Sequence, residues 1–464
     1  MGPRITFLVG GMIMLIVQGS IYTVAKFKLP YASITLPLLN SLTMVGTGFI
    51  TAFYATLPVQ HYQRRRGEAT SLVKSFVGLS GAAVAQLFYL IFPDVDKSSP
   101  ACLNVILIWM GIIVVCCAIG MFLVPAQSEA DPSRESFARL RLLWWLLLGW
   151  GLCTTVVSLQ EVLFKDNALQ KALGISMLVL LACPLLILAW WNHRGELHTA
   201  AVYDEAFESE AKGFWQMVAT PDAWLIFIAA SAVVGGGQVI STSMSQILTA
   251  GGNKSNVALV LGQTLYSTGN LLGRLTVMGP SDLFVRRGIP RPCFVVIILM
   301  SMAMAHVLFL LLPASNGSVG LIAAGSLLAG LSFGSMFPHM VVLASELFGS
   351  RNLSTNYMLF DGGSSFVSFA IFAKLLAGGV EQAHTHGHKD CAGAGCFRLT
   401  HVVVIASNLS AMAGTLVVAA RSRGLYLQIL RAHRGVQALA TADTQADHIV
   451  PAATIDKKPL ALPS

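Results

Sequence analysis

The sequence predicts an all-α protein that crosses a membrane many times. Of its 464 residues, 55% are hydrophobic and only 11% are charged, whereas soluble domains carry roughly 25% charged residues. The apolar residues form uniform runs of about 20 residues, the length that a helix needs to cross a hydrocarbon layer of about 30 Å. A β-barrel would instead show segments of about ten residues with alternating character. We therefore expect a polytopic bundle of transmembrane helices rather than a soluble globular protein.

Twelve stretches of the chain are long and apolar enough to be membrane-spanning helices. We place these spans at residues 5–26, 34–58, 71–92, 102–124, 141–163, 169–191, 223–247, 257–278, 292–313, 318–345, 355–378 and 399–420.

The basic residues are concentrated in alternate links between these spans. With a cytosolic N-terminus, the inside segments and adjoining span ends up to residue 434 contain 18 Lys and Arg residues, and the outside ones contain 9. Positive residues favour the cytosolic side of a membrane, so we expect both termini in the cytosol. The formal net charge of +8 then follows from topology. We expect the lipid bilayer as a partner and no nucleic acid.

Two segments of the chain resemble copies of each other. Arg66 precedes the third span, and Gly78 follows twelve residues later; Arg351 and Gly363 repeat this spacing at the eleventh span. Internal repeats of this kind are typical of transporters. In an arrangement of six plus six helices, the third span would pair with the ninth and not with the eleventh.

The mismatch of two spans disappears if two helices are absent from the start of the chain and two extra helices are inserted between the halves. The sequence then predicts a two-bundle fold with four, two and six helices out of a plan of six, two and six. The predicted parts are an incomplete four-helix N-terminal bundle (1–124), two inserted linker helices (125–191), a cytosolic loop (192–222), a C-terminal six-helix bundle (223–423) and a disordered cytosolic tail (424–464).

Four segments carry a family signature. They read RRRGEATSLVKSFVGLSGAAVAQLF (64–88), GNLLGRLTVMGPSD (269–282), LASELFG (343–349) and CAGAGCFRL (391–399). Together they resemble the nodulin-like group of the major facilitator superfamily, over about residues 1–423. The resemblance implies a major-facilitator-type fold similar to that of the oxalate/formate exchangers. The family's first two helices have no counterpart, which indicates a truncated gene model, an alternative start or a degenerate carrier. The resemblance names no solute.

Two charged residues fall inside predicted spans. Asp361 lies about six residues into the eleventh span, where a charge costs at least about 2.5–3.5 kcal/mol. Asp361 therefore faces a cavity, binds a proton, or pairs with a neighbouring helix. Lys74 lies one turn into the third span; it either extends back to the cytosol or points inward, where it would attract an anionic solute. Carriers of the resembled kind bind solute between two bundles near the bilayer midplane, so both are candidate substrate-binding residues.

Further candidate substrate-binding residues occur in the seventh and eighth spans. Gly236 and Gly237 belong to a run of three glycines that precedes Gln238. Such a run either unwinds a helix and exposes its backbone to a solute or permits close helix packing. Gln263 and Asn270 are seven residues apart and therefore share one helix face. We favour a site for the glycine run and expect these polar residues to line the same cavity.

In the tenth span, Gly330 and Gly334 form a GxxxG pair. Close packing of two helices is the better interpretation of this pair. His339 follows in the same span and is more typical of a hydrogen-bonded structural residue than of a proton relay.

The stretch from Gly262 to Gly288 predicts a gate between two helices that slide. An apolar helix narrows through glycines and ends in a short loop that carries both signs of charge. A basic loop alone would explain the arginines but not Asp282. We expect ion pairs at the cytosolic rim that stabilise one state and break as the halves move. The candidate gating residues are Arg66, Arg274, Asp282, Arg286, Arg287, Glu346 and Arg351.

Cys391 and Cys396 share a polar outside loop, so the sequence permits one disulfide there. The nearby His384, His386 and His388 are suitable ligands for a transition metal, but a flexible polar loop is the simpler interpretation. We therefore predict no metal site and no cofactor.

The sequence favours a secondary transporter that moves a small polar or anionic metabolite by alternating access, with a proton or a counter-solute as a coupling partner left open. A membrane enzyme is disfavoured because the sequence has no GxxxxGK[ST] or HExxH motif. The alternative is a truncated relic that does not transport, or a membrane receptor or sensor.

Overall fold

A computed structural model describes most of the chain. The described residues are 3–61, 66–91, 103–123, 137–163, 172, 175, 211–385, 391 and 393–449.

The described residues form helices joined by short turns, with no strand among them. Eight of the described helices are long and apolar enough to cross a membrane. The prediction of an all-α polytopic membrane protein is therefore confirmed. The predicted span 169–191 lies outside the described residues, apart from Ala172 and Ile175. The four, two and six plan and its internal symmetry stay predictions.

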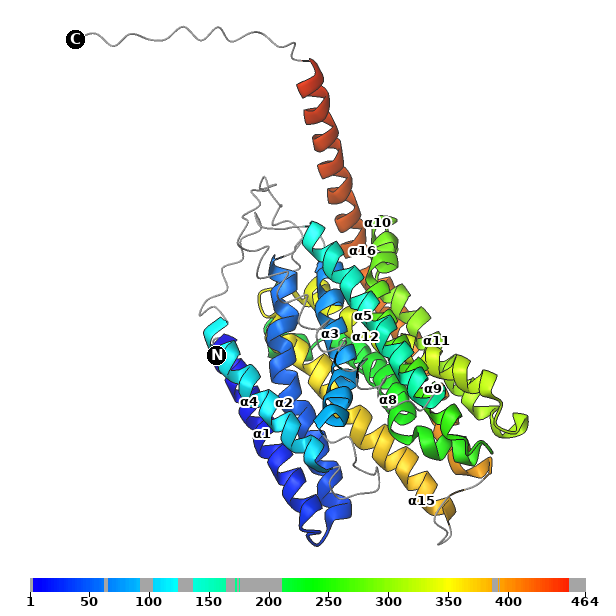
Figure 1. Cartoon of the computed structure of the whole chain (residues 1–464). Helices are drawn as coiled ribbons and strands as arrows, with labels where there is room; N and C mark the ends of the chain where they lie inside the picture. Colours follow the sequence, from blue (N-terminus) through cyan, green and yellow to red (C-terminus); the bar gives the residue numbers. More distant parts are fainter. Residues whose placement is uncertain are drawn as a thin grey trace, which may run out of the picture.

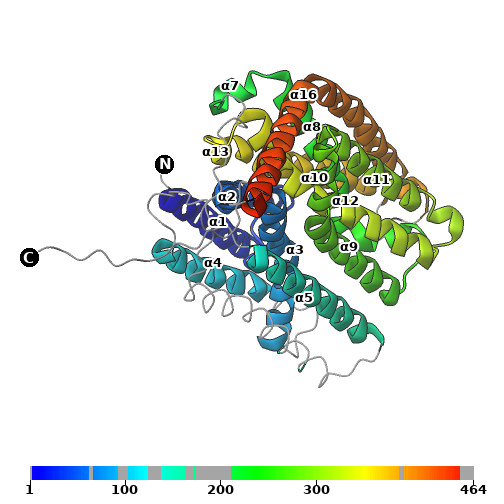
Figure 2. The same cartoon turned by 90° about the horizontal axis from the view of Figure 1, so that it is seen from above.

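An N-terminal group of helices lies on one side of the molecule, blue to cyan in Figure 2. Helices α1 and α4 pack side by side, α2 joins α1 to α3, and α5 packs against α3 and against α9 of the other group. The group consists of α1 (Pro3–Lys26), α2 (Ala32–His61), α3 (Arg66–Ile91), α4 (Asn104–Leu123) and α5 (Phe137–Leu163).

A C-terminal group, green to red in Figure 1, forms the other side. Its long helices are α8 (Pro221–Ala250), α9 (Asn256–Thr276), α11 (Pro292–Leu310), α12 (Val319–Phe348) and α16 (Gly395–Ile449). Shorter elements join them: α7 (Phe214–Val218), α10 (Met278–Arg286), η5 (Pro313–Ser315), α13 (Leu353–Met358), η6 (Leu359–Gly363), α14 (Ser364–Val367), η7 (Ser368–Gly378) and α15 (Gly379–Thr385).

The predicted span 355–378 is not one regular helix. It runs through α13, η6, α14 and η7, and η6 and η7 are π-helical. Asp361 lies in η6, beside Gly362, whose Cα approaches Gly48 of α2. Single π-helical turns are frequent at functional sites. The irregular backbone thus coincides with the charged residue that the sequence places within this span.

Helices α9 and α12 pack backbone to backbone. Gly269 and Gly273 on α9 face Gly330 and Gly334 on α12, and a Cβ at any of these four positions would collide with the backbone of the opposite helix. The packing role predicted for Gly330 and Gly334 agrees with this geometry. Small residues allow such contact because two helix backbones can meet directly.

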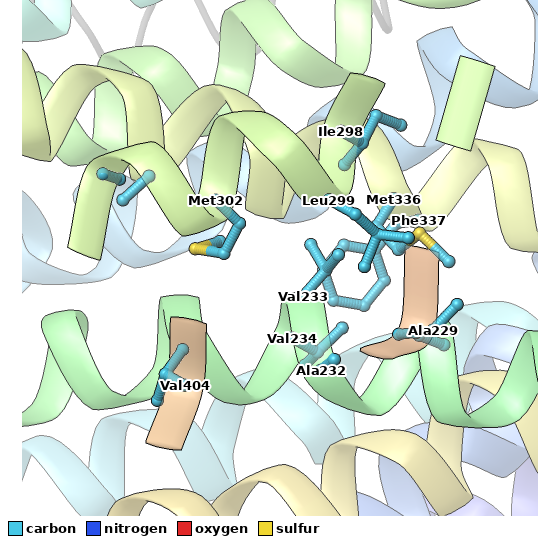
Figure 3. Packing of buried hydrophobic residues seen from close by; sticks show 14 of the residues in the cluster. Ala229, Ala232, Val233, Val234, Ile298, Leu299, Met302, Met336, Phe337 and Val404 are labelled. Carbon is cyan, nitrogen blue, oxygen red and sulfur yellow. The ribbon is translucent and has the colours of Figure 1, made fainter. Parts of the chain in front are cut away.

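The apolar core of the C-terminal group lies where α8, α11, α12 and α16 converge (Figure 3). Val233 of α8, Leu299 and Met302 of α11, and Phe337 of α12 point toward one another there, and Val404 of α16 closes one end. This core stabilises the C-terminal group, which supplies part of the candidate functional site.

The start of α3, α10, the end of α12 and the extension of α16 lie at one end of the bundle, which we call the α10 face (Figure 1). The opposite end carries α15 and is called the α15 face. Helix α16 continues to Ile449, so the disorder expected from residue 424 onward does not hold for residues 424–449. At the start of this extension, Tyr426 and Ile429 pack against Val285 of α10.

Candidate functional site

Lys74 and Asp361 meet between the two groups of helices. Lys74 Nζ lies 3.6 Å from Asp361 Oδ2, and the two residues are 1% and 6% exposed. Lys74 thus points inward from α3 and does not extend back to the face. Aromatic rings surround its ammonium group: the distances to the ring centroids are 4.6 Å for Tyr357, 5.4 Å for Tyr54 and 5.8 Å for Phe337.

Arg274 of α9 is the second buried cation of this region, with 3% exposure. Its Nε donates to Asn270 Oδ1 at 2.9 Å, its Nη1 donates to the Lys74 carbonyl oxygen at 3.0 Å, and its guanidinium lies 4.3 Å from the Phe337 ring. The Ser71 hydroxyl donates to the Arg274 carbonyl. No carboxylate of the described residues forms an ion pair with Arg274. Only neutral groups satisfy this cation.

We call Lys74, Arg274, Asp361 and the surrounding rings the central cluster. It contains two buried cations and one carboxylate, so one positive charge is uncompensated among the described residues. An uncompensated buried charge is costly, because the interior solvates it poorly. An anion that entered between α3, α9 and η6 would restore the balance and would be bound by charge-assisted hydrogen bonds.

A second charged network closes the α10 face between the two groups. Glu346 at the end of α12 accepts from Arg66 Nη2 at 3.0 Å, from Arg291 Nε and Nη2 at 3.0 Å, and from the Tyr426 hydroxyl at 2.7 Å. Arg291 Nη2 also lies 2.8 Å from Asp282 Oδ1. We call Arg66, Asp282, Arg291, Glu346 and Tyr426 the gate network. Its two cations are matched by two carboxylates.

Arg291 is the centre of the gate network and is 3% exposed. Its Nη1 donates to Ser281 Oγ at 2.8 Å, and the same hydroxyl lies 3.1 Å from His339 Nε2. Burial lowers the pKa of Arg291, but the Glu346 and Asp282 carboxylates more than offset this effect and raise it above the usual range. A raised pKa of a cation means that its stabilising contribution is complete at every pH below the unfolded value. Arg291 therefore stays positively charged across the pH range in which proteins are studied.

The predicted gating residues separate into three sets. Arg66, Asp282 and Glu346 lie in the gate network, whereas Arg274 lies deeper and belongs to the central cluster. The side chains of Arg286, Arg287 and Arg351 are exposed, and no described ion pair includes them.

Two residues of the gate network were not among the predicted gating residues. Arg291 precedes Pro292, so its place immediately before a helix that starts with proline is a signal in the sequence. Tyr426 falls within the segment expected to be disordered, and only the fold shows that α16 continues there. All five residues of the gate network thus lie outside the predicted spans.

The glycine run 235–237 remains helical within α8, and the non-helical residue of α8 is Ser243. A Cβ at Gly235 would collide with the ring of Phe372, and one at Gly237 would collide with the ring of Phe333. In this conformation the run serves close packing. The local unwinding that the sequence permits is absent in α8 at residues 235–237, so substrate binding by Gly236 and Gly237 stays a prediction.

The predicted polar residues differ in their distance from the central cluster. Asn270 bonds to Arg274 and belongs to the cluster. Gln238 is half-buried and Gln263 is exposed, and neither side chain has a described hydrogen bond. The structure therefore brings Lys74, Asp361 and Asn270 together and leaves Gln238 and Gln263 outside.

On the α15 face, a disulfide joins Cys391 to Cys396. His384 Nδ1 lies 2.8 Å from the Val380 carbonyl oxygen, and His386 and His388 lie outside the described residues. Within the described ranges, no three His, Cys, Asp or Glu side chains gather in a way that could hold a metal ion.

Comparisons with known proteins agree with this multi-pass helical architecture. Residues 2–189 match the family model Nodulin-like. The chain is also similar to the Protein NUCLEAR FUSION DEFECTIVE 4 of Arabidopsis thaliana, with 22% identity over 338 residues, which cover 65% of this chain and 56% of that protein. The chain thus spans a little over half the length of this curated relative. The first 189 residues of the chain are thus similar to nodulin-like proteins.

Proposed function

We propose that this protein is a secondary transporter of the major facilitator type that moves a small anionic metabolite by alternating access. The observation that carries the proposal is the central cluster, in which the described residues place two buried cations beside one carboxylate: Asp361 pairs with Lys74, and Arg274 bonds to neutral groups. The nodulin-like match supports a role in transport. It ends at residue 189, so the cluster combines Lys74 from the matched part with Arg274 and Asp361 from the remainder.

The anion would bind between Lys74 and Arg274. Arg274 presents a planar group of donors that suits a carboxylate or a phosphate, and its Nε and Nη1 are already oriented by Asn270 and by the Lys74 carbonyl. Asp361 competes with the anion for Lys74. The aromatic rings of Tyr54, Phe337 and Tyr357 exclude water, which strengthens each electrostatic contact.

The gate network controls access to this site from the α10 face. Arg66 belongs to the N-terminal group, and Arg291 and Glu346 belong to the C-terminal group, so their contacts hold the two groups together. Opening this face requires the Arg66–Glu346 pair to separate. The excess of basic residues in these links supports a cytosolic location for the α10 face.

Uptake of labelled organic anions into proteoliposomes that contain the full chain tests this function. The panel should include monocarboxylates and dicarboxylates. We expect uptake of at least one anion by the wild type, and a decrease of roughly tenfold or more in the variants Lys74→Gln and Arg274→Gln, because a lost charged contact in a dry site is worth about 1.5–3 kcal/mol.

Matched controls are Lys374→Gln and Arg423→Gln, which remove exposed cations outside the cluster. Both should transport as the wild type does. Uptake that is equal in the cluster variants and in the controls would contradict the proposed site. No uptake of any anion by a correctly folded wild type would favour the alternative, a relic or a membrane receptor.

A further inference from the structure

A buried histidine pair lies in the C-terminal group, apart from the central cluster. His306 of α11 and His401 of α16 are 0% and 2% exposed. Their Nδ1 atoms are 3.0 Å apart, and His306 Nε2 lies 3.2 Å from the Gly236 carbonyl oxygen of α8. Three helices therefore meet through one chain of hydrogen bonds.

The contacts determine which ring nitrogens carry protons. A carbonyl oxygen only accepts, so His306 Nε2 carries a hydrogen, and the Nδ1 of a neutral His306 is then an acceptor. His401 Nδ1 must donate to it. This leaves the lone pair of His401 Nε2 without a hydrogen-bond donor among the described residues.

The short distance between the rings favours a proton over a metal ion. A metal bound by two imidazoles needs about 2.0–2.1 Å to each nitrogen, so a metal held directly between the rings would separate them by roughly 4 Å. The observed separation of 3.0 Å suits an N–H···N hydrogen bond.

Solvent can approach the pair through a small pocket on the α15 face. His401 lines this pocket together with Phe397, Arg398 and Gly393, whereas its α8 and α11 walls carry no charge. Helix α12 approaches through Gly325, which contacts Phe309. The titratable and charged groups near the pair, among the described residues, are thus Arg398 and, from α15, His384 beside Gly395.

We propose that the His306–His401 pair is a proton-binding site that is loaded at His401 Nε2 from the α15 face. One proton from water binds the free lone pair, no other bond breaks, and the pair becomes a cation. Burial among apolar groups opposes a charged imidazolium. The protonated pair therefore favours a conformation in which water enters the pocket, and acidification shifts the population toward that conformation.

The pair is connected to the helix that supports the central cluster. Gly236 precedes Gly237, whose carbonyl accepts from the Tyr266 hydroxyl at 3.0 Å. The Tyr266 ring lies 5.8 Å from Phe333, and Phe333 lies 5.1 Å from Phe337, the ring that covers Arg274. A change at the pair thus has a packed route to the cluster.

Histidine C2 and backbone amide hydrogen exchange test the proposal on the full chain in lipid nanodiscs, between about pH 5 and about pH 8, where histidine normally titrates. We expect the C2 exchange of His401 to change as the pH falls. The amides of residues 236–244 should exchange at least about threefold faster on the acidic side of the same midpoint. A His401 that stays neutral throughout, or α8 amides that do not respond at its midpoint, would overturn the proposal.

The variant His401→Gln removes the basic imidazole lone pair that binds the proton. It should therefore abolish the pH response of α8. His384→Gln, on the same face but outside the pair, should retain it. An unchanged response in His401→Gln would also overturn the proposal, and if that variant does not fold, the wild-type titration decides. These measurements do not depend on transport. A failure to take up anions would contradict only the proposed function. A lack of pH response in α8 would contradict only the proton-binding role of the histidine pair.

Discussion

The central cluster and the gate network both join the N-terminal group to the C-terminal group, but their charges balance differently. In the gate network, Arg66 and Arg291 face Glu346 and Asp282, and a tyrosine hydroxyl completes the coordination of Glu346. In the central cluster, the described part of the chain places Lys74 and Arg274 beside one carboxylate, Asp361, which pairs with Lys74. A network whose positive and negative charges balance holds two surfaces together. A network with an excess positive charge can instead bind an anion. The predictions below test this difference.

The largest effect is expected from Glu346→Gln. It leaves Arg66 and Arg291 without their shared carboxylate, and removal of one partner of a buried ion pair costs about 3–5 kcal/mol. Thermal unfolding in detergent should show the loss. A cysteine introduced near the start of α3 should react faster with a soluble thiol reagent in this background. An unchanged melting temperature and reactivity would show that the network does not hold the face closed.

A smaller effect is expected from Tyr426→Phe. This variant keeps the buried ring and removes one hydrogen bond to a charged carboxylate, which is worth about 1.5–3 kcal/mol. Both ion pairs of Glu346 remain, so the gate should weaken without opening. Thiol reactivity between those of the wild type and Glu346→Gln is the expected result. A reactivity equal to that of Glu346→Gln would assign the closure to α16 rather than to the ion pairs.

Asp361→Asn should act in the opposite direction on ligand binding. It removes the carboxylate that competes with an anion for Lys74, so a transported anion should bind roughly tenfold more tightly, which corresponds to about 1.4 kcal/mol. Turnover should fall because release is slower. Binding can be measured as the anion-dependent rise in melting temperature. Weaker binding in Asp361→Asn would mean that Asp361 contacts the solute rather than competing with it.

The smallest effect is expected from Arg421→Gln. Arg421 Nε forms a 3.0 Å pair with Asp222 Oδ1, but the Arg421 side chain is 53% exposed. Exposed pairs contribute about 0–1 kcal/mol. Unfolding and uptake should therefore remain close to those of the wild type, which makes this variant the control for buried pairs. If Arg421→Gln destabilised the protein as much as Glu346→Gln does, burial would not explain why the two ion pairs differ in strength.

The sequence predicts the charges of both networks better than it predicts their partners. Asp361 and Lys74 are visible because a charge inside an apolar span needs a reason. That they face each other depends on how α3 packs against η6, and spacing within one helix contains no such information. Arg274 shows the limit: the sequence places it at the end of a span, and the tight crossing of α9 and α12 directs it inward instead.

Helix boundaries account for the other differences. The segment after Gly424 begins with apolar residues, Leu425, Tyr426, Leu427, Ile429 and Leu430, a signal that the expectation of disorder overlooked. The first part of this extension of α16 is packed, because Tyr426 and Ile429 contact Val285 of α10. The glycine run of α8 likewise allows two conformations. Contacts with Phe333 and Phe372, which come from distant parts of the chain, select the packed one.

The hydrogen bond from Arg274 to the carbonyl oxygen of Lys74 uses a peptide group and not a side chain. Any amino acid other than proline at position 74 that preserves the helix would present the same oxygen, so the orientation of the guanidinium does not depend on the lysine. Position 74 can therefore be exchanged to retune selectivity while the anchor for the ligand's negative charge stays in place. If the protein is the proposed anion carrier, this separation gives it a simple route by which it can acquire new cargo.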